Sequence, residues 1–549
     1  MAGLAAVFGS GAMTNSIEEI GAADCIFIIG SNTSVAHPLI ATRVYRAKAR
    51  GAKIIVADPR KIPMVLQADL HLQQRLGTDV ALVNGLMHII LKNGWQDQAF
   101  VDERTENFEE FKKVVENYPP ERVSEITGIP AADLEKAAEY FARAERASIL
   151  YTMGITQHTT GVDNVKSLGN LAMLTGNMGK ESTGVNPLRG QNNVQGACDM
   201  GGLPNVYTGY QAVTDPAVKQ KFEEAWGAKL SDKVGLTATE IFPAILNGKV
   251  KGLIVLGENP VVSDADSYHV EKALKALDFL LVIDIFRTPT SDLAHVVLPG
   301  ASFAEKDGTF SNTERRVQMV RKAIEPPGEA KPDWRIVQEL SNRFGYPMDY
   351  ESPRLIMEEI ARLTPSYGGI HYDRLQGDGL LWPCPNREHP GTKFLHQGRF
   401  TRGKGLLTPI EYKPAAEMPD EEFPFQLTTG RIHAHYHTGT MTRNSPSLER
   451  EIHECFLEIN PADASELGIA DGEKVLITSR RGSVSTRVKL TDGENRKTVF
   501  MPFHFVESRA NILTNPTYDP IAKIPELKVC SVKIEKMKTE LNPPSASTN

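Results

Sequence analysis

This sequence contains few cysteines, and no two of them have the close spacing of a metal-binding pair. Only five occur in 549 residues, and none belongs to a C-x-x-C pair. A structural zinc site or an iron–sulfur cluster held by this chain is therefore not expected, and neither is a disulfide framework. We interpret the cysteines mainly as small buried side chains. They are Cys25, Cys198, Cys384, Cys455 and Cys530.

An excess of basic charge and long apolar runs are also absent. The net charge of −7 offers no electrostatic footprint for nucleic acid or anionic lipid. No apolar run approaches the roughly 18 residues of a membrane span, and no basic segment precedes an apolar core at the N-terminus. We predict a cytoplasmic protein without direct membrane insertion. With 41% apolar and 23% charged residues, it has the composition of a globular protein. Its length predicts roughly three or four domains.

Two short apolar runs near the N-terminus have the order of a nucleotide-binding sheet. Residues 25–29 end at Gly30-Ser31-Asn32 and precede a helical stretch, and residues 53–57 end at Asp58-Pro59-Arg60. Strand, glycine turn, helix, strand and acid form the βαβ plan of such sheets. The first fifteen residues are apolar and glycine-rich, which is typical of a domain interior rather than a ragged terminus.

The same plan occurs a second time. Residues 252–256 end at Gly257-Glu258-Asn259, and residues 279–283 end at Asp284. The separation of glycine and acid is 28 residues in the first copy and 27 in the second. A lone G-x-N is more often an ordinary turn, but two copies with matching acids favour ligand binding. Backbone amides there could hold a pyrophosphate, and each acid could accept from a ribose hydroxyl or a purine edge.

Residues 186–204, N-P-L-R-G-Q-N-N-V-Q-G-A-C-D-M-G-G-L-P, have neither helical nor strand periodicity. We expect an irregular loop around which the chain is organised. Four amide side chains and the permanent cation Arg189 suit a hydrogen-bonding heterocycle beside a small anion. The alternative is a solvated surface loop rich in turn formers. The amides are Gln191, Asn192, Asn193 and Gln195.

The sequence pattern changes twice in the later part of the chain. Residues 305–316 are polar and turn-rich, and helical stretches alternate with proline- and glycine-rich connections from about 326 to 404. From residue 423 we expect strands at 427–431, 474–478, 483–490 and 498–505, which predicts a β-barrel. His433, His435 and His437 would share one face of a strand, but no acid or cysteine at ligand-like spacing joins them, so a metal site is disfavoured.

Four motifs together resemble one family. They are R-G-Q-N-N-V-Q-G-A-C-D-M-G, M-G-I-T-Q-H, N-L-A-M-L-T-G-N-M-G-K and A-D-P-R. They resemble the catalytic alpha subunit of molybdenum- or tungsten-dependent formate dehydrogenases, in the bis-molybdopterin guanine dinucleotide (DMSO reductase-like) oxidoreductase superfamily. The resemblance covers the chain to about residue 536 and implies that cofactor, oxidation of formate to CO2, and iron–sulfur electron-transfer subunits as partners.

The resemblance implies an α/β fold with two pseudo-symmetric nucleotide-binding domains, each with a parallel sheet, and a C-terminal six-stranded β-barrel. We expect a first domain at 1–190, a second at 191–303 that is incomplete in its N-terminal part, and a mixed connection at 304–404. The barrel is expected at 405–538 and a disordered tail at 539–549.

The resemblance also assigns site residues, with no metal ligand among them. The first nucleotide is expected near Gly30, Ser31, Asn32, Asp58, Arg60, Gly77 and Asp79. The second is expected near Gly257, Glu258, Asn259, Asp284 and Thr288. The pterins and their surroundings are matched by Met153, Gly154, Gln157, Gln191, Gly430, Arg431, His437, Thr438, Asn511 and Lys528. Arg189 matches the formate-binding arginine, whose planar fork fits a carboxylate in two parallel hydrogen bonds.

The sequence departs from the family pattern at its start. The family's C-x-x-C-x-x-x-C region, its metal-ligating cysteine or selenocysteine and the following histidine are not in this sequence, and Met1-Ala2-Gly3-Leu4 matches the family's V-A-G-L just after them. We expect an iron–sulfur cluster only in that missing part, an in-frame TGA selenocysteine codon upstream, and no formate oxidation by this chain alone. The alternatives are another molybdopterin oxidoreductase of the superfamily, or a cofactor-binding subunit without catalysis.

Overall fold

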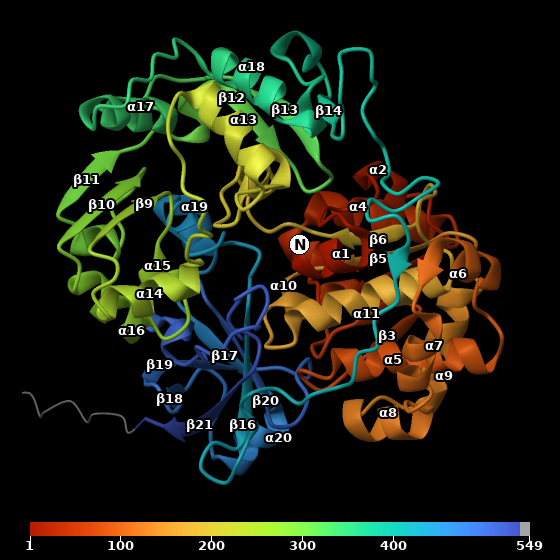
Figure 1. Ribbon diagram of the computed structural model, residues 1–549. Helices are drawn as coiled ribbons and strands as arrows, with labels where there is room; N and C mark the ends of the chain where they lie inside the picture. Colours follow the sequence, from red (N-terminus) through yellow and green to blue (C-terminus); the bar gives the residue numbers. More distant parts are fainter. Residues whose placement is uncertain (538–549) are drawn as a thin grey trace, which may run out of the picture.

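The computed structural model describes residues 1–537, and the predicted disordered tail lies outside these residues. Figure 1 shows a first α/β unit coloured red to yellow, a smaller yellow-green one, and a blue C-terminal barrel beside both. The two α/β units with parallel sheets and the six-stranded barrel confirm the predicted fold class. In residues 1–537, no helix is both long and apolar enough to cross a membrane.

The first unit is built on a five-stranded parallel sheet in the order β3-β2-β1-β5-β6. Alternate residues of β1 face opposite sides, so Phe27 and Ile29 enter one core while Ile26 and Ile28 enter another. Apolar strands buried on both faces are typical of parallel sheets. The strands are β1 Cys25–Ile29, β2 Lys53–Ala57, β3 Leu70–Leu72, β5 Ala147–Tyr151 and β6 Gly184–Pro187.

Helices cover both faces of this sheet. Leu4, Val7 and Phe8 of the first helix are fully buried, so the opening residues do lie in a domain interior. One face is covered by α1 Ala2–Phe8, α5 Asp79–Lys92, α7 Phe108–Val115, α8 Pro120–Thr127, α9 Ala131–Ala142 and α11 Gly161–Leu174, and the other by α2 Ile17–Ile20 and α4 Pro38–Ala49. Shorter elements are α3 Thr33–Ala36, α6 Gln98–Arg104, α10 Met153–Thr156, and β4 Thr105–Glu106, which pairs with β15 Gly405–Leu406.

The second unit has a three-stranded parallel sheet in the order β11-β10-β9. Leu280 and Val282 of the central strand pack under one helical layer, while Leu281 and Ile283 contact the helix α17 from further along the chain. The strands are β9 Gly252–Leu256, β10 Phe279–Asp284 and β11 Val296–Pro299. The helices are α14 Ala238–Leu246, α15 Pro260–Ser263, α16 Ser267–Lys275 and α17 Asp333–Arg343.

The central loop is more regular than predicted. Its first residues belong to β6, and Val194–Asp199 form the helix α12. Asn193, with φ 60°, starts this helix, and six residues are too few to show a helical period. The chain continues through β7 Val206–Tyr207, η2 Thr208–Tyr210, β8 Gln211–Ala212 and α13 Pro216–Trp226.

Apart from α17, the elements of residues 304–404 form a small antiparallel sheet with one covering α-helix. Part of the polar stretch 305–316 is strand rather than loop, and Arg315 is fully buried. Its guanidinium donates to four backbone oxygens, which belong to Met13, Trp382, Thr392 and Lys393. The elements are β12 Gly308–Ser311, β13 Arg316–Val320, β14 Leu380–Leu381, α18 Pro353–Leu363 and η5 Pro365–Tyr367.

The C-terminal unit is a closed barrel in the order β16-β20-β17-β19-β18-β21. The strands β18 and β19 have the predicted bounds, and they pair as an antiparallel hairpin. β17 and β21 were not predicted. The elements are β16 Phe425–Gly430, β17 Phe456–Ile459, β18 Lys474–Thr478, β19 Ser483–Leu490, β20 Thr498–Pro502, β21 Cys530–Lys536, α19 Pro446–Glu451 and α20 Pro461–Glu466.

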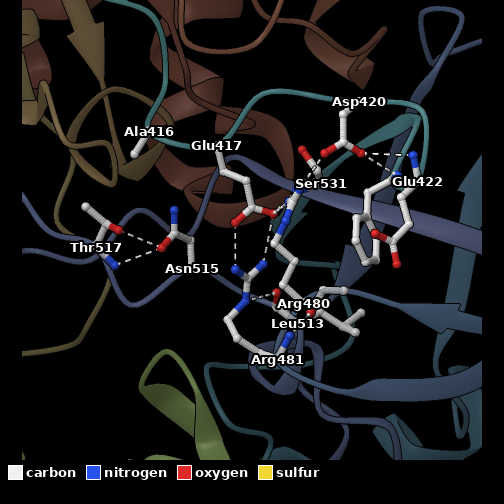
Figure 2. Close-up of polar contacts among 12 residues, drawn as sticks. Ala416, Glu417, Asp420, Glu422, Arg480, Arg481, Leu513, Asn515, Thr517 and Ser531 are labelled. Carbon is white, nitrogen blue, oxygen red and sulfur yellow. Dashed lines mark hydrogen bonds and ion pairs between the residues drawn. The ribbon is translucent and has the colours of Figure 1, made fainter.

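A strap at residues 411–423 leads into the barrel and is fastened to it by Glu417 (Figure 2). The Glu417 carboxylate accepts from Arg481 Nη1 at 2.6 Å, from Arg480 Nη1 at 2.9 Å and from the Ser531 backbone N–H at 2.8 Å. These donors lower the pKa of Glu417 although its burial opposes them. The strap is therefore joined to the β18–β19 turn and to β21 at once.

Candidate functional site

One cavity of about 610 Å³ lies where the two α/β units and the barrel meet. It is within the volume range of small-molecule sites. Predicted residues from all three units line it: Gly30, Asn32, Asp58, Arg60, Gly77, Asp79, Met153, Gly154, Gln157, Gln191, Gly257, Glu258, Asn259, Asp284, Gly430, Arg431, His437, Thr438, Asn511 and Lys528. Thr288 instead lines a neighbouring cavity of about 280 Å³ with Asn259 and Thr438. Ser31 and Arg189 line neither of these two cavities.

The turns after β1 and β5 meet at the centre of the first sheet, where the strand order reverses. Gly30 has φ +55°, and its carbonyl oxygen accepts from the Gly154 N–H at 3.1 Å and from Thr152 Oγ1 at 2.7 Å. A Cβ on Gly154 would lie 2.5 Å from that oxygen. The two glycines thus let the turns touch backbone to backbone. Ligands of open α/β sheets bind at such a switch point.

Two buried acids of the first unit line the cavity. Asp58 follows β2, and burial raises its pKa to about 6 although the Arg60 N–H donates to it at 3.0 Å. Burial also raises the pKa of Asp79, whose Oδ1 accepts from Gln74 at 3.2 Å. Carboxyl groups kept from water in this way gain by accepting hydroxyl or amino groups of a ligand.

Lys528 reaches the same wall from the barrel. Its Nζ donates to the Thr429 carbonyl oxygen at 2.6 Å, and burial lowers its pKa to about 7. Nearby Arg431 and Arg60 lower it further, whereas Asp58 raises it. An anionic ligand in the cavity would stabilise the charged form of this lysine.

Arg60 has a different environment from the one predicted. Its Nε donates to Glu494 at 2.6 Å, its Nη2 pairs with Glu458, and its guanidinium carbon lies 3.4 Å from the centre of the Phe500 ring. All three partners belong to the barrel. The Arg60 side chain therefore joins the first unit to the barrel. Its positive charge is already largely compensated by the two glutamates, without a ligand.

The second unit repeats the strand-end arrangement. Gly257 after β9 has φ +63°, and the Asn259 oxygen accepts from Thr290 Oγ1 at 2.7 Å. Burial raises the pKa of Glu258 and of Asp284, the acid at the end of β10. From the barrel, Asn511 Nδ2 donates to two backbone oxygens of α15, each at 2.9 Å. A barrel loop is thereby fixed over this half of the cavity.

Two residues after β16 bring the barrel to the central loop. Arg431 donates to His437 Nε2 at 2.8 Å and to the Gly190 carbonyl oxygen at 3.4 Å. Burial lowers the pKa of His437 to about 3, so the ring is neutral and can accept. A Cβ on Gly190 would lie 2.3 Å from the Arg431 guanidinium, so this close approach requires glycine.

Arg189 lies between Leu188 and Gly190, which line the cavity, and it is held at three points. Its backbone N–H donates to Thr313 Oγ1 at 2.9 Å, its carbonyl oxygen accepts from His37 Nε2 at 2.8 Å, and its Nε donates to Gln195 Oε1 at 3.1 Å. Nη2 is buried and has no protein partner among residues 1–537. A buried guanidinium nitrogen without an acceptor marks a place for an anion.

The four amides of the central loop divide into two pairs. Gln191 and Asn192 line the cavity. Asn193 instead accepts from the Ser311 N–H at 2.9 Å, and Gln195 is bonded to Arg189 and Asp199. The hypothesis that such a loop serves a ligand beside a small anion therefore fits the first pair and Arg189, while the second pair holds the loop itself.

The histidine-rich segment after β16 is a loop, so its side chains do not alternate as on a strand. His433 is exposed, whereas His435 Nε2 bonds the Ile452 carbonyl oxygen at 2.6 Å. His504 bonds the His437 carbonyl oxygen and the Ile432 N–H. Within the part of the chain that the structure describes, no three His, Cys, Asp or Glu side chains are placed to hold a metal ion. The five cysteines are buried and free.

Several polar atoms of the cavity wall have no protein partner, and all of the residues that carry them except Asn32 were missed by sequence reasoning. Asn32 Oδ1, His37 Nδ1, Gln74 Oε1 and His158 Nδ1 are buried atoms without a hydrogen-bond partner in residues 1–537. His37, Gln74 and His158 come from three separate segments, and only His158 belongs to a quoted motif, M-G-I-T-Q-H. The fold brings the three side chains together. Buried polar groups without partners are costly, and a polar ligand in the cavity would satisfy them.

Comparisons with known proteins agree with this arrangement. The family model described as Molybdopterin oxidoreductase matches residues 4–343, and the one described as Molydopterin dinucleotide binding domain matches residues 425–531. The chain is 54% identical over 540 residues to the F420-dependent formate dehydrogenase subunit alpha of Methanocaldococcus jannaschii, covering 97% of this chain and 80% of that one.

Two further proteins extend the comparison. Formate dehydrogenase H of Escherichia coli is 41% identical over 542 residues, which are 97% of this chain and 76% of that one. The solved structure of acetylene hydratase from Pelobacter acetylenicus superimposes with a TM-score of 0.77 at 21% identity, covering 98% of this chain and 80% of that one. At that identity the likeness concerns the fold alone.

Proposed function

This chain belongs to the molybdopterin oxidoreductase family, and from that premise we propose that it is the catalytic alpha subunit of a formate dehydrogenase, which oxidises formate to CO2. The relative that is 54% identical is named F420-dependent formate dehydrogenase subunit alpha, and the one that is 41% identical is named Formate dehydrogenase H. The observation that carries the proposal is Arg189. Its guanidinium is anchored at Nε, and its buried Nη2 has no acceptor in residues 1–537. The residues on either side of Arg189 line a cavity with the volume of a small-molecule site.

The cavity fits a bis-molybdopterin guanine dinucleotide of molybdenum or tungsten. The fit rests on the unpartnered wall atoms, the touching glycine turns and the repeated acids at the strand ends. When bound, this group supplies the two-electron redox chemistry of the reaction. Asp58 and Asp79 would hold one nucleotide, Asp284 and Asn259 the other, and Lys528 would offset phosphate charge.

The chain's own residues would bind and orient the substrate. The planar guanidinium of Arg189 can donate two parallel hydrogen bonds to the formate carboxylate and remains charged at any working pH. Neutral CO2 has no such attraction to a cation, so the product leaves easily. Positioning by a pre-formed charge of this kind is a principal way in which proteins accelerate reactions.

We further propose iron–sulfur subunits as electron-transfer partners, since a relative is named as subunit alpha. The cytoplasm remains the proposed location, on the sequence argument alone.

The test is to express the tagged chain from its complete coding region, including whatever precedes Met1, with its accompanying subunits in a host that makes the cofactor. The purified complex should release guanine nucleotide and should convert 13C-formate to 13CO2 with a dye as electron acceptor. Full cofactor content without 13CO2 would contradict formate oxidation and favour a cofactor-binding subunit without catalysis. Absence of guanine nucleotide would contradict the cofactor assignment.

A further inference from the structure

One carboxylate near Arg189 has a role that the proposed function does not explain. Asp199, at the end of α12, is completely buried and accepts four hydrogen bonds from side chains. No ion pair is formed by it within residues 1–537. The donors are Gln195 Nε2 at 2.8 Å, Tyr210 OH at 2.7 Å, Tyr367 OH at 2.5 Å and Trp382 Nε1 at 2.7 Å.

The contact with Gln195 determines which way its amide faces. Residues 195 and 199 are four apart on α12, so their side chains lie on one face. Both Gln195 N–H bonds are used, one to Asp199 and one to the Tyr210 hydroxyl at 3.0 Å. An amide has donors at one end and an acceptor at the other. Its oxygen must therefore point away from Asp199, toward Arg189.

That oxygen is the only acceptor that the Arg189 guanidinium has in residues 1–537. Gln195 Oε1 receives the Arg189 Nε–H at 3.1 Å. A guanidinium is planar, so fixing Nε fixes the direction of both terminal nitrogens. If the amide turned over, two N–H groups would face a cation, and the contact would be lost.

We propose that Asp199 is a positioning residue for the anion-binding arginine. It orients the Gln195 amide, and the amide oxygen then holds Arg189 in the plane that a small planar carboxylate requires. The inference rests on the proposed function, because formate is the anion that Arg189 would bind. Asp199 itself does not touch the substrate.

The test compares Asp199→Asn with a reciprocal swap. The asparagine amide can donate as well as accept hydrogen bonds. It therefore no longer requires the Gln195 N–H groups to face it, and the Gln195 oxygen is no longer directed toward Arg189. In the double variant Asp199→Asn/Gln195→Glu, both oxygens of the introduced glutamate are acceptors, one for Arg189 Nε and one for the introduced asparagine. Net charge is the same as in the wild type.

The readouts are binding and turnover, each per bound cofactor. Nitrate serves as the probe for binding by calorimetry, because it is a planar monoanion with no hydride to give. We expect Asp199→Asn to weaken nitrate binding and to lower formate kcat/KM by about tenfold to a hundredfold, since small misplacements of a binding group have such effects. The double variant should recover both to within about threefold of the wild type.

Asp463→Asn is the matched control. Asp463 is also completely buried, but it lies in the barrel, where it bonds Arg496 and the Lys497 N–H. The substitution Asp463→Asn should lower Tm and leave nitrate affinity per bound cofactor unchanged. If Asp199→Asn yields no folded protein, Tyr210→Phe removes one partner of the same amide and should weaken nitrate binding by a smaller factor.

The outcomes separate the two proposals. A wild type that turns over formate and binds nitrate, with an Asp199→Asn variant that does both equally well, overturns the inference alone. The inference is also overturned if Asp199→Asn weakens nitrate binding and turnover, the double variant does not recover them, and Tm falls as it does in Asp463→Asn. A cofactor-loaded wild type that neither binds nitrate nor oxidises formate overturns the proposed function, and the inference with it.

Discussion

At the scale of single residues, Arg189 is held at one end and open at the other. Its backbone and Nε are bonded to Thr313, His37 and Gln195, whereas Nη2 has no protein acceptor among the described residues. A lysine in its place would keep the positive charge. It would lose both the contact to Gln195 and the fork that fits a carboxylate.

Arg189→Lys is therefore expected to lower formate kcat/KM at unchanged cofactor content. One charge-assisted hydrogen bond contributes roughly 1.5–3 kcal/mol, which corresponds to a decrease of about tenfold to a hundredfold. Steady-state kinetics should be measured beside metal and guanine nucleotide analysis. Equal kinetics at full occupancy would remove Arg189 from the substrate site.

Two control variants make this result specific. Asp58→Ala should do the reverse, lowering bound guanine nucleotide while the loaded fraction keeps its formate KM. Arg321→Lys changes an exposed arginine whose side chain bonds only Gln376 within residues 1–537, and it should alter neither quantity.

Some residue partners were beyond the reach of sequence reasoning. Arg60 was predicted from the family resemblance, and it does line the cavity. Its charge is nevertheless taken by Glu494 and Glu458, which lie 434 and 398 residues away along the chain. Nothing in a strand-end pattern indicates a partner at that distance. The same holds for His37 and His158, whose unpartnered nitrogens only the fold brings to one wall.

At the scale of elements, the touching turns after β1 and β5 are the feature on which the first half of the cavity depends. Gly154→Ala would place a Cβ 2.5 Å from the Gly30 oxygen, so the turns must separate. We expect a marked loss of bound pterin and guanine nucleotide, measured per folded chain. Gly51→Ala is the control, because Gly51 has φ +98° but open space around it and lies away from the cavity. Equal cofactor content in both variants would contradict the account.

The strap before the barrel gives a prediction with a defined pH dependence. Removing the Glu417 charge by Glu417→Gln should cost about 2 kcal/mol at pH 7, since it weakens contacts to Arg481 and Arg480. Because the folded pKa of Glu417 is lowered, its stabilisation is complete above the unfolded value of about 4.3 and is lost as pH falls through the folded value.

The difference in Tm between wild type and Glu417→Gln should thus be largest near neutrality and disappear in acid. Thermal unfolding from pH 7 down to pH 3 measures it. The exposed residue Glu422 provides the control Glu422→Gln, for which no difference is expected. A difference that stayed constant with pH would show that Glu417 acts through packing rather than charge.

Elements with a strong local pattern were predicted well. Continuous apolar runs gave β1, β2 and β10, because a strand buried on both faces needs no polar alternation. The same pattern gave β9, although Ile254 and Leu256 on it are about half exposed. The hairpin of β18 and β19 follows from its alternation and its glycine turn. The helix α12 was missed because Gly196 and its six-residue length hide any helical period. The strand β17, with four residues, is specified mainly by its barrel neighbours.

At the scale of the whole molecule, the cavity exists only because three units are held together. Arg60 joins the first unit to the barrel, and Asn511 joins the barrel to the second unit. The repeat in the sequence predicted two strand-end sites. It did not predict that a barrel would close over both, because closure depends on contacts between distant segments.

Arg60→Gln should weaken the contact between the first unit and the barrel. Breaking a buried ion pair costs about 3–5 kcal/mol because the remaining carboxylates lose their partner. We expect lower Tm and faster hydrogen exchange in β20 and in the segment after β2. Arg287→Gln, at an exposed pair with Asp292, should change stability by about 1 kcal/mol or less. Similar exchange in the two variants would show that Arg60 does not join the units.

The most direct test of the account is an experimental structure of the cofactor-loaded protein soaked with nitrate. We predict pterin dinucleotide density in the shared cavity, with nucleotides beside Asp58 and Asp284, and a planar anion within hydrogen-bond distance of Arg189 Nη2. A dinucleotide bound elsewhere, or an anion that does not contact Arg189, would contradict the account.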